Sequence, residues 1–167
     1  MTEAEFSQDE LRERLYAEVR ADARIVMLGL VGEKAGHMQP MAAFVREGGG
    51  PFWFFTHTST DLYRDAGAGR DAMACLMASD GKFQACVLGR LAVARDRAAV
   101  DEFWSPYVAA WHPGGKDDPE LGLLRLDPAE ARLWIAKSGA LGFAYEIAKA
   151  NLTKTLPEVG VKADLAL

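Results

Sequence analysis

The residues with the clearest chemical potential lie at the end of an aromatic run, in the stretch PFWFFTHTSTD at residues 51–61. The rings are followed by hydroxyl side chains and one imidazole: Thr56, His57, Thr58, Ser59 and Thr60. Such hydroxyls can cap a helix, because an N-cap oxygen accepts a hydrogen bond from a free backbone N–H group. They can also hold a small anion, because the N–H groups and the dipole at a helix start attract negative charge. Both interpretations stay open, although the carboxylate of Asp61 disfavours an anion unless it faces away.

Other residue types that carry catalysis form no recognisable pattern in this chain. His37, His57 and His112 are far apart in the sequence, and Cys75 and Cys86 belong to no CxxC motif, so no metal site is predicted. The sequence contains neither a G-x-S-x-G elbow nor a glycine-rich phosphate loop. We therefore expect the histidines to be structural or solvent-exposed, and we assign no catalytic residue.

The composition restricts the class of protein. Half of the 167 residues are apolar and 26% are charged, which is typical of one globular domain with its own core. The net charge of -5 and the scattered Lys and Arg residues argue against nucleic acids and anionic membranes as partners. The apolar runs are shorter than the ~20 residues that span a bilayer, and the acidic start does not resemble a signal peptide. A cytoplasmic location is therefore expected.

Periodicity and capping signals predict the elements that must position these residues. A capping box opens an amphipathic helix with Leu11, Leu15 and Val19 on one face. Runs rich in β-formers then predict strands joined by short loops, and Pro106 interrupts a later helix. The predicted strands are 24–31, 38–46, 52–56, 72–79, 82–93, 121–126 and 130–136; the predicted helices are 9–22, 58–66, 96–112 and 139–152, before an irregular tail at 155–167.

The stretch AMACLMASDGKFQACVLGRLAV predicts a β-hairpin. Its Asp-Gly pair at 80–81 suits a two-residue type I′ turn, which places Cys75 opposite Cys86 in a hydrogen-bonded pair. In a cytosolic protein we interpret these residues as small apolar core residues and not as a disulfide. They share one strand face with Met77, Gln84 and Leu88, so Gln84 is the polar member of a mostly apolar face.

Strands joined mainly by hairpins, with helices at the start, middle and end, predict an α+β fold around a small barrel. The alternation of strands and helices that a Rossmann fold requires is absent from the sequence. We expect one domain over residues 1–167, with an N-terminal helix in 1–23, the barrel in 24–137, and a C-terminal helix and tail in 138–167.

Several of these segments resemble a known family. RIVMLGL, GHMQPM, WFFT followed by hydroxyl residues, and PYVAAWHPGGKDDPELGLLRL are similar to the general stress protein branch of the pyridoxamine 5′-phosphate oxidase-like, FMN-binding split-barrel family. The similarity covers about Arg24 to Trp134. It implies a six-stranded antiparallel split β-barrel with flanking helices, which forms a homodimer and binds FMN at the subunit interface.

The resemblance also implies which residues contact the cofactor. Phe55 and Thr56 would face the flavin ring, Ser59 and Thr60 would lie near its phosphate, and Trp134 would come from the other subunit. Gln84 stands where the oxidase relatives have a glutamine that reaches the flavin. The complete set of expected cofactor-binding residues is Gln39, Pro40, Met41, Phe55, Thr56, Ser59, Thr60, Gln84 and Trp134.

The chain departs from the family pattern at two positions. The family usually has an Arg before the Pro-Met of the second strand, where this chain has Gln39, and a Lys in the hydroxyl segment, where it has Asp61. Charge-assisted hydrogen bonds contribute roughly 1.5–3 kcal/mol each, so the loss of two would weaken phosphate binding by about 10²–10⁴-fold. Arg24, Arg70 and Lys82 are the candidate replacements.

Two functions follow from these observations. The first is a flavin-dependent oxidoreductase of low specificity, or a flavin carrier, in which the cofactor supplies the redox chemistry. The second is a dimeric binding or interaction protein without flavin, which kept the fold and lost the phosphate site. The substrate and the electron donor are not indicated by the sequence.

Overall fold

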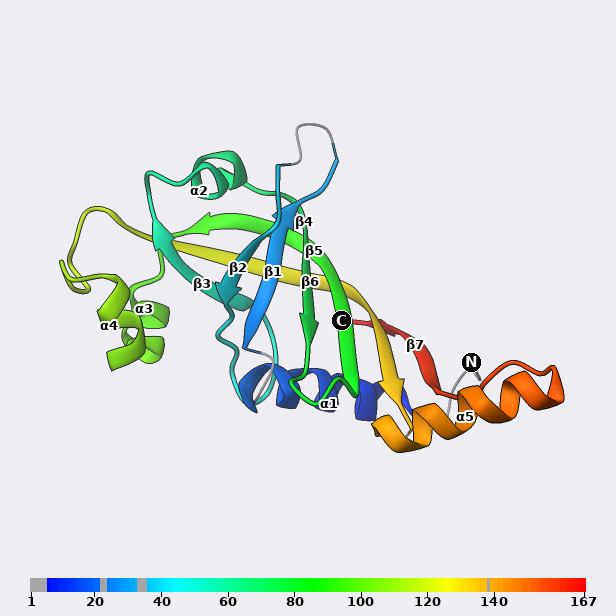
Figure 1. The fold of residues 1–167 in the computed structure, drawn as a ribbon. Helices are drawn as coiled ribbons and strands as arrows, with labels where there is room; N and C mark the ends of the chain where they lie inside the picture. Colours follow the sequence, from blue (N-terminus) through cyan, green and yellow to red (C-terminus); the bar gives the residue numbers. More distant parts are fainter. Residues whose placement is uncertain (1–5, 22–23, 33–35, 138) are drawn as a thin grey trace.

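The computed structural model describes residues 6–21, 24–32, 36–137 and 139–167 (Figure 1). The α+β class expected from the sequence is confirmed, with helices around one antiparallel sheet. The helices are α1 Gln8–Ala21, α2 Asp61–Ala66, α3 Arg97–Phe103, α4 Pro106–Trp111 and α5 Ala140–Thr153. The strands are β1 Ile25–Leu30, β2 Gln39–Ala42, β3 Phe52–His57, β4 Arg70–Met77, β5 Phe83–Ala94, β6 Leu121–Ala136 and β7 Gly160–Ala166.

Among the described residues the sheet has seven strands, one more than the six that the family resemblance implies. Its order is β2-β1-β4-β5-β6-β3, with β7 paired to β6. All described pairings are antiparallel, which agrees with the short hairpin connections in the sequence. The sheet is not closed, but an isolated bridge between Phe44 and Trp53 joins the segment after β2 to β3. This arrangement brings the ends of β2 and β3 together, although they lie at opposite ends of the strand order.

The four consecutive rings of β3 are explained by burial on both faces of the strand. Phe52 and Phe54 belong to the main core, together with Leu15 of α1 and other apolar side chains of the sheet. Trp53 belongs to a second cluster, formed with α3 and α4, and Phe55 packs against that cluster. A strand that is covered on both sides cannot alternate apolar and polar residues, because each face needs apolar contacts.

The predicted hairpin forms, but the predicted turn type is wrong. Cys75 lies opposite Cys86 as expected, yet Ala78 donates its backbone N–H to the carbonyl of Phe83 over 2.9 Å. The loop therefore has four residues, and the alternation of pairs places the cysteines at a non-hydrogen-bonded position, where side chains approach more closely. Gly81 alone in this loop has a positive φ, of 69°, whereas a type I′ turn needs two such residues.

The two cysteines are free thiols, as expected, with their Sγ atoms 2.9 Å apart. Burial first, and then the hydrogen bond with Cys86, raise the pKa of Cys75 to about 12. Both side chains are half-buried on the outer face of the sheet and not in the main core, which corrects our interpretation of them as core residues.

The predicted strands 121–126 and 130–136 are one continuous strand, β6, so the turn predicted at Asp127-Pro128 is wrong. The pairing with β5 shifts between Leu88 and Gly89, and Pro128 lies opposite Gly89. Pro128 has no N–H group, and a β-bulge absorbs the missing ladder bond. Gly89 is required there, because a Cβ atom would overlap the carbonyl of Asp127.

The tail predicted to be irregular contains β7, which pairs along the second half of β6. Val161 and Leu165 of β7 are buried against the sheet. Gln8 of α1 ties this strand to the start of the chain, since its amide donates to the carbonyl of Asp164 and accepts from the N–H of Ala166. Strand β7 therefore belongs to the sheet, and α1 contacts it.

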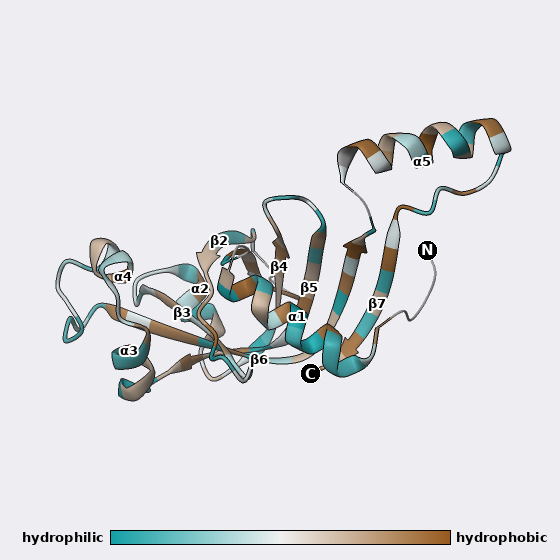
Figure 2. Cartoon of the chain, turned by 90° about the horizontal axis from the view of Figure 1, so that it is seen from below, coloured by the Kyte–Doolittle hydropathy of each residue, from teal (hydrophilic) through white to brown (hydrophobic). Residues whose placement is uncertain are grey.

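Helix α5 projects away from the barrel between β6 and β7 (Figures 1 and 2). Its exposed face carries large apolar side chains, and Glu146 and Lys149 are the only charged residues within it. Leu141 is 90% exposed, and Tyr145 and Leu152 are also exposed. In a single copy of the chain, no other apolar surface covers these side chains within the described residues.

Candidate flavin-binding groove

The main candidate site is a groove of about 400 Å³ between the edge strand β2, the end of β3, and helix α4. Four of the expected cofactor-binding residues line it: Pro40, Met41, Phe55 and Thr56. The other lining residues are Ile25, Ala42, Phe44, His57, Tyr107, Val108, Trp111 and His112. This set contains no Lys, Arg, Asp or Glu, so the walls are mainly apolar and aromatic. Their polar side-chain groups are the hydroxyls of Thr56 and Tyr107, the indole N–H of Trp111 and the two imidazoles.

The hydroxyl cluster after β3 is organised around a helix cap. Thr60 is the N-cap of α2, and its Oγ1 accepts a hydrogen bond from the N–H of Tyr63. The same Oγ1 donates to the carbonyl of His57 over 2.9 Å and lies 3.2 Å from the Oγ1 of Thr56. The capping interpretation is therefore confirmed for Thr60, and these bonds engage its hydroxyl within the chain. Ser59 stays exposed beside it.

A cation that the sequence analysis missed lies next to Ser59. Arg64 donates from Nη1 to the carbonyl of Ser59 over 2.6 Å, and its Nη2 contacts the carboxylate of Asp61. The charge of Asp61 is thus paired, which weakens the repulsion that we expected from it. The signal was present in the sequence, because Asp61 and Arg64 are three residues apart on one predicted helix.

The three cations proposed as replacements lie in different places. Arg24 sits over the ring of Phe44 at 5.6 Å from its centroid, and Phe44 lines the groove. Arg70 opens β4 opposite Leu91. Lys82 lies in the β4–β5 loop, with its Nζ 3.6 Å from a carboxylate oxygen of Asp80. Of these three residues, Arg24 is the one that contacts a residue lining the groove.

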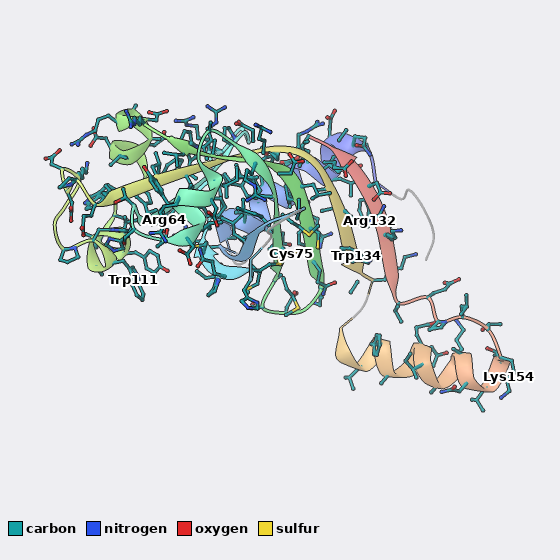
Figure 3. The ribbon with its side chains drawn as sticks, turned by 90° about the horizontal axis from the view of Figure 1, so that it is seen from above. Arg64, Cys75, Trp111, Arg132, Trp134 and Lys154 are labelled. Atoms are coloured by element: carbon teal, nitrogen blue, oxygen red, sulfur yellow. The ribbon has the colours of Figure 1, made fainter. Side chains whose placement is uncertain are left out.

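Gln84 and Trp134 lie together but away from this groove. They are directly opposite each other on β5 and β6, and both line a smaller cavity of about 260 Å³ beside α5. The Nε2 of Gln84 donates to the carbonyl of Gly81 over 2.5 Å. Figure 3 shows Trp111 and Trp134 at opposite ends of the barrel. One copy of the chain therefore divides the expected residues into two clusters.

Gln39, Ser59 and Thr60 are the expected residues that neither cavity includes, and the hydroxyl of Thr60 is engaged in the helix cap. Gln39 begins β2 and pairs with Leu28 of β1, one residue before Pro40 of the groove wall. Ser59 follows the end of β3 by two residues. Gln39 and Ser59 are thus close in the chain to groove residues but do not line the groove.

His112 is one of the groove residues that the sequence analysis did not assign to the site. It is only 5% exposed, and its ring lies among those of Phe55, His57 and Trp104, with the His57 centroid at 4.8 Å. Its Nδ1 is buried and has no hydrogen-bond partner among the described residues. Burial first, and then the neighbouring His57, lower the pKa of His112, while Asp118 raises it. A polar turn follows His112 in the sequence, and no local signal indicated that the side chain would be buried in the groove.

The lowered pKa of His112 predicts a pH-dependent stability. Below the ordinary pKa of about 6.5 the unfolded chain takes up a proton before the folded chain does, so the free energy of unfolding falls as the pH falls. The slope is at most about 1.4 kcal/mol per pH unit. Urea denaturation of the wild-type protein and of His112→Gln between pH 7.5 and 5 measures it. The variant should lose part of the slope, and identical slopes would contradict the prediction.

Two findings concern classes of site that the sequence did not predict. Within the described ranges, no group of three or more His, Cys, Asp and Glu side chains is arranged to hold a metal ion. In that same part of the chain, no helix combines the length and apolar character that crossing a membrane requires.

The antiparallel sheet with its flanking helices has the fold of the FMN-binding split-barrel proteins. Residues 10–158 match the family model described as pyridoxamine 5′-phosphate oxidase like. The chain belongs to the pyridoxamine 5′-phosphate oxidase-like family. The resemblance stated from the sequence is thereby confirmed.

Solved structures place the chain near the general stress proteins of this family. A structure from Jannaschia sp. CCS1, described as a general stress protein 26, has 33% identity and a TM-score of 0.79 over 95% of this chain and 99% of its own. The general stress FMN/FAD binding protein of Xanthomonas citri has 42% identity and a TM-score of 0.73 over 78% of this chain and 92% of its own. A search of curated proteins finds no match.

Proposed function

We propose that this protein binds a flavin, FMN, in the groove between β2, β3 and α4, and acts as a flavin-dependent oxidoreductase of low specificity or as a flavin carrier. The observation that carries the proposal is the lining of the groove, which is aromatic and apolar and contains four of the residues expected at the cofactor. A planar tricyclic ring is stabilised by such walls. When bound, the flavin supplies the redox chemistry, and the protein holds and orients it.

The residues of this chain fit the ring better than the phosphate. Pro40 and Met41 offer an apolar edge, and Phe55 and Thr56 offer a ring and a hydroxyl. The phosphate would lie beyond the groove, at the exposed Ser59 and the guanidinium of Arg64, which already contacts the Ser59 carbonyl. One partly engaged Arg replaces the usual Arg and Lys, so we expect binding in the micromolar range or weaker.

We also propose that the functional unit is a homodimer in which the second copy brings its Gln84 and Trp134 to the groove of the first. Two observations support it. One chain keeps these residues away from the groove. In addition, two apolar surfaces of the chain lack cover: the outer sheet face with the exposed Met27 and Met77, and helix α5, which adjoins it through Phe143. A second copy is the occupant that covers both surfaces at once.

Substitutions that introduce charge on α5 test the proposed dimer. Leu141→Glu with Leu152→Glu should convert a dimer into a monomer of 18.2 kDa, because each change would bury a carboxylate in an apolar contact. Size-exclusion chromatography with light scattering measures the mass. Asn151→Glu, on another face of the same helix, is the matched control and should stay dimeric. A wild-type monomer, or a dimer that survives the double change, would contradict the assignment.

The test of the flavin proposal is a visible spectrum of the purified protein, followed by titration of the flavin-free protein with FMN. Saturable quenching of flavin fluorescence at micromolar concentration supports it. A colourless protein that ignores FMN up to about millimolar, where binding is worth only ~4 kcal/mol, favours the second function, a dimeric binding protein without flavin. This second function is supported by the groove lining, which has no charged side chain among the described residues to bind a phosphate. A cytoplasmic location remains part of the proposal.

A further inference from the structure

The groove contains a polar group whose role flavin binding does not explain, the imidazole of His112. The side chain is only 5% exposed, and its Nδ1 has no hydrogen-bond partner in the described part of the chain. Such a group is costly, because a buried polar atom without a hydrogen bond loses its hydration. An unpaired buried N–H is rarer than an unpaired acceptor, so we assign the proton to Nε2. His112 lines the groove, and Nε2 is the ring nitrogen left to donate to a ligand there.

The surroundings of His112 disfavour a charged ligand. Among the described residues, no Lys, Arg, Asp or Glu lines the groove. The carboxylate of Asp118 also acts on His112, and its charge repels an anion. A cation would meet no carboxylate in the groove lining and would desolvate at a cost. The lowered pKa of His112 agrees with a neutral imidazole in this environment. The chemistry at this end therefore suits an uncharged ligand that accepts one hydrogen bond.

Helix α4 forms an aromatic wall of the groove next to His112. Trp111 is 69% exposed and Tyr107 is 47% exposed, and both line the cavity. These rings stand on α4, opposite the strand residues that we assign to the flavin. Exposed aromatic rings around a concave site favour a planar partner, since stacking removes their faces from water.

We propose that the α4 side of the groove binds a second ligand, an uncharged planar aromatic carbonyl compound of the quinone class, whose oxygen accepts a hydrogen bond from Nε2 of His112. Trp111 and Tyr107 cover its ring. This inference deepens the proposed function, because such a ligand would lie beside the flavin as its substrate. The binding itself depends only on residues of this chain, so it can be measured with or without the cofactor.

The experiment titrates the full-length protein with duroquinone, a neutral and fully methylated quinone that thiols cannot add to. Calorimetry is performed without FMN and with saturating FMN, and toluate serves as an anionic ring of similar size. We expect duroquinone to bind in both cases and toluate to bind at least about tenfold more weakly. His112→Phe should weaken duroquinone binding about 3- to 10-fold, whereas His112→Gln, which keeps an N–H donor, should stay within about twofold. Trp111→Ala should weaken binding by a similar factor to His112→Phe.

Four results would overturn the inference. They are an absence of duroquinone binding in the FMN-free protein, equal binding by His112→Phe, toluate binding as tight as duroquinone, and displacement of duroquinone by FMN. Displacement would show that the groove holds a single ring, and it would leave the flavin proposal intact. If the protein does not bind FMN at all, the flavin proposal fails, and the FMN-free titrations of the wild-type protein and the variants still decide on the second ligand.

Discussion

Gln39→Arg combined with Asp61→Lys should tighten FMN binding by at least about tenfold. Gln39 stands at the start of β2, next to the groove residue Pro40, and a guanidinium there can contact a phosphate through two hydrogen bonds. The change at Asp61 has a second effect that the structure reveals. It releases Arg64 from its carboxylate partner and leaves the guanidinium beside Ser59 for the ligand.

The measurement is a fluorescence titration of flavin-free protein at two salt concentrations. A gain that comes from phosphate contacts should shrink at high salt, because exposed charges are screened. Asp65→Lys is the matched control, since it makes the same charge change on α2 at an exposed position. We expect this control to alter the affinity by less than about threefold. An unchanged affinity in the double variant would place the phosphate elsewhere or exclude a flavin from this groove.

Leu165→Ala should lower the free energy of unfolding by about 2–5 kcal/mol. Leu165 is 2% exposed in β7 and packs with the main core, so its truncation removes apolar contacts and leaves a cavity. Urea denaturation at a fixed protein concentration measures the difference. The matched control is Leu156→Ala, the same substitution at a position that is 87% exposed, and it should change the stability by less than about 0.5 kcal/mol.

If the tail were irregular, as the sequence analysis predicted, the two substitutions would have a different effect on the free energy of unfolding. A disordered C-terminus would make both leucines equally tolerant, and Leu165→Ala would then lie within about 0.5 kcal/mol of the wild-type protein. A large loss for Leu165 and a small one for Leu156 would establish β7 as part of the folded sheet. Equal losses would contradict the pairing of β7 with β6.

Local signals predicted much of the fold because their physics acts within a few residues. The capping box before α1 forms as expected, with both the N–H and the hydroxyl of Ser7 bonded to the carboxylate of Glu10. Leu11, Leu15 and Val19 face the core, as their spacing predicted. The break at Pro106 also occurs where a residue without an N–H group must begin a new helix.

The errors occurred where distant segments decide the structure. Asp127-Pro128 has the composition of a turn, yet the bulge opposite Gly89 lets β6 continue through it. Residues 160–166 bury few side chains, so their pattern is weak, and pairing with β6 alone makes them a strand. The Asp-Gly pair predicted a hairpin correctly, but the surrounding ladder selected a longer loop than the dipeptide prefers.

The sequence by itself determined the family, the α+β class, the main helices and strands, and four residues of the groove, since motifs and periodicity are properties of the chain. The tertiary structure alone decided which of the chemical groups meet. It buried His112 against Phe55, paired Asp61 with Arg64, and separated Gln84 and Trp134 from the groove. The physical reason is that burial and electrostatic environment depend on elements from remote parts of the chain, and no local pattern records them.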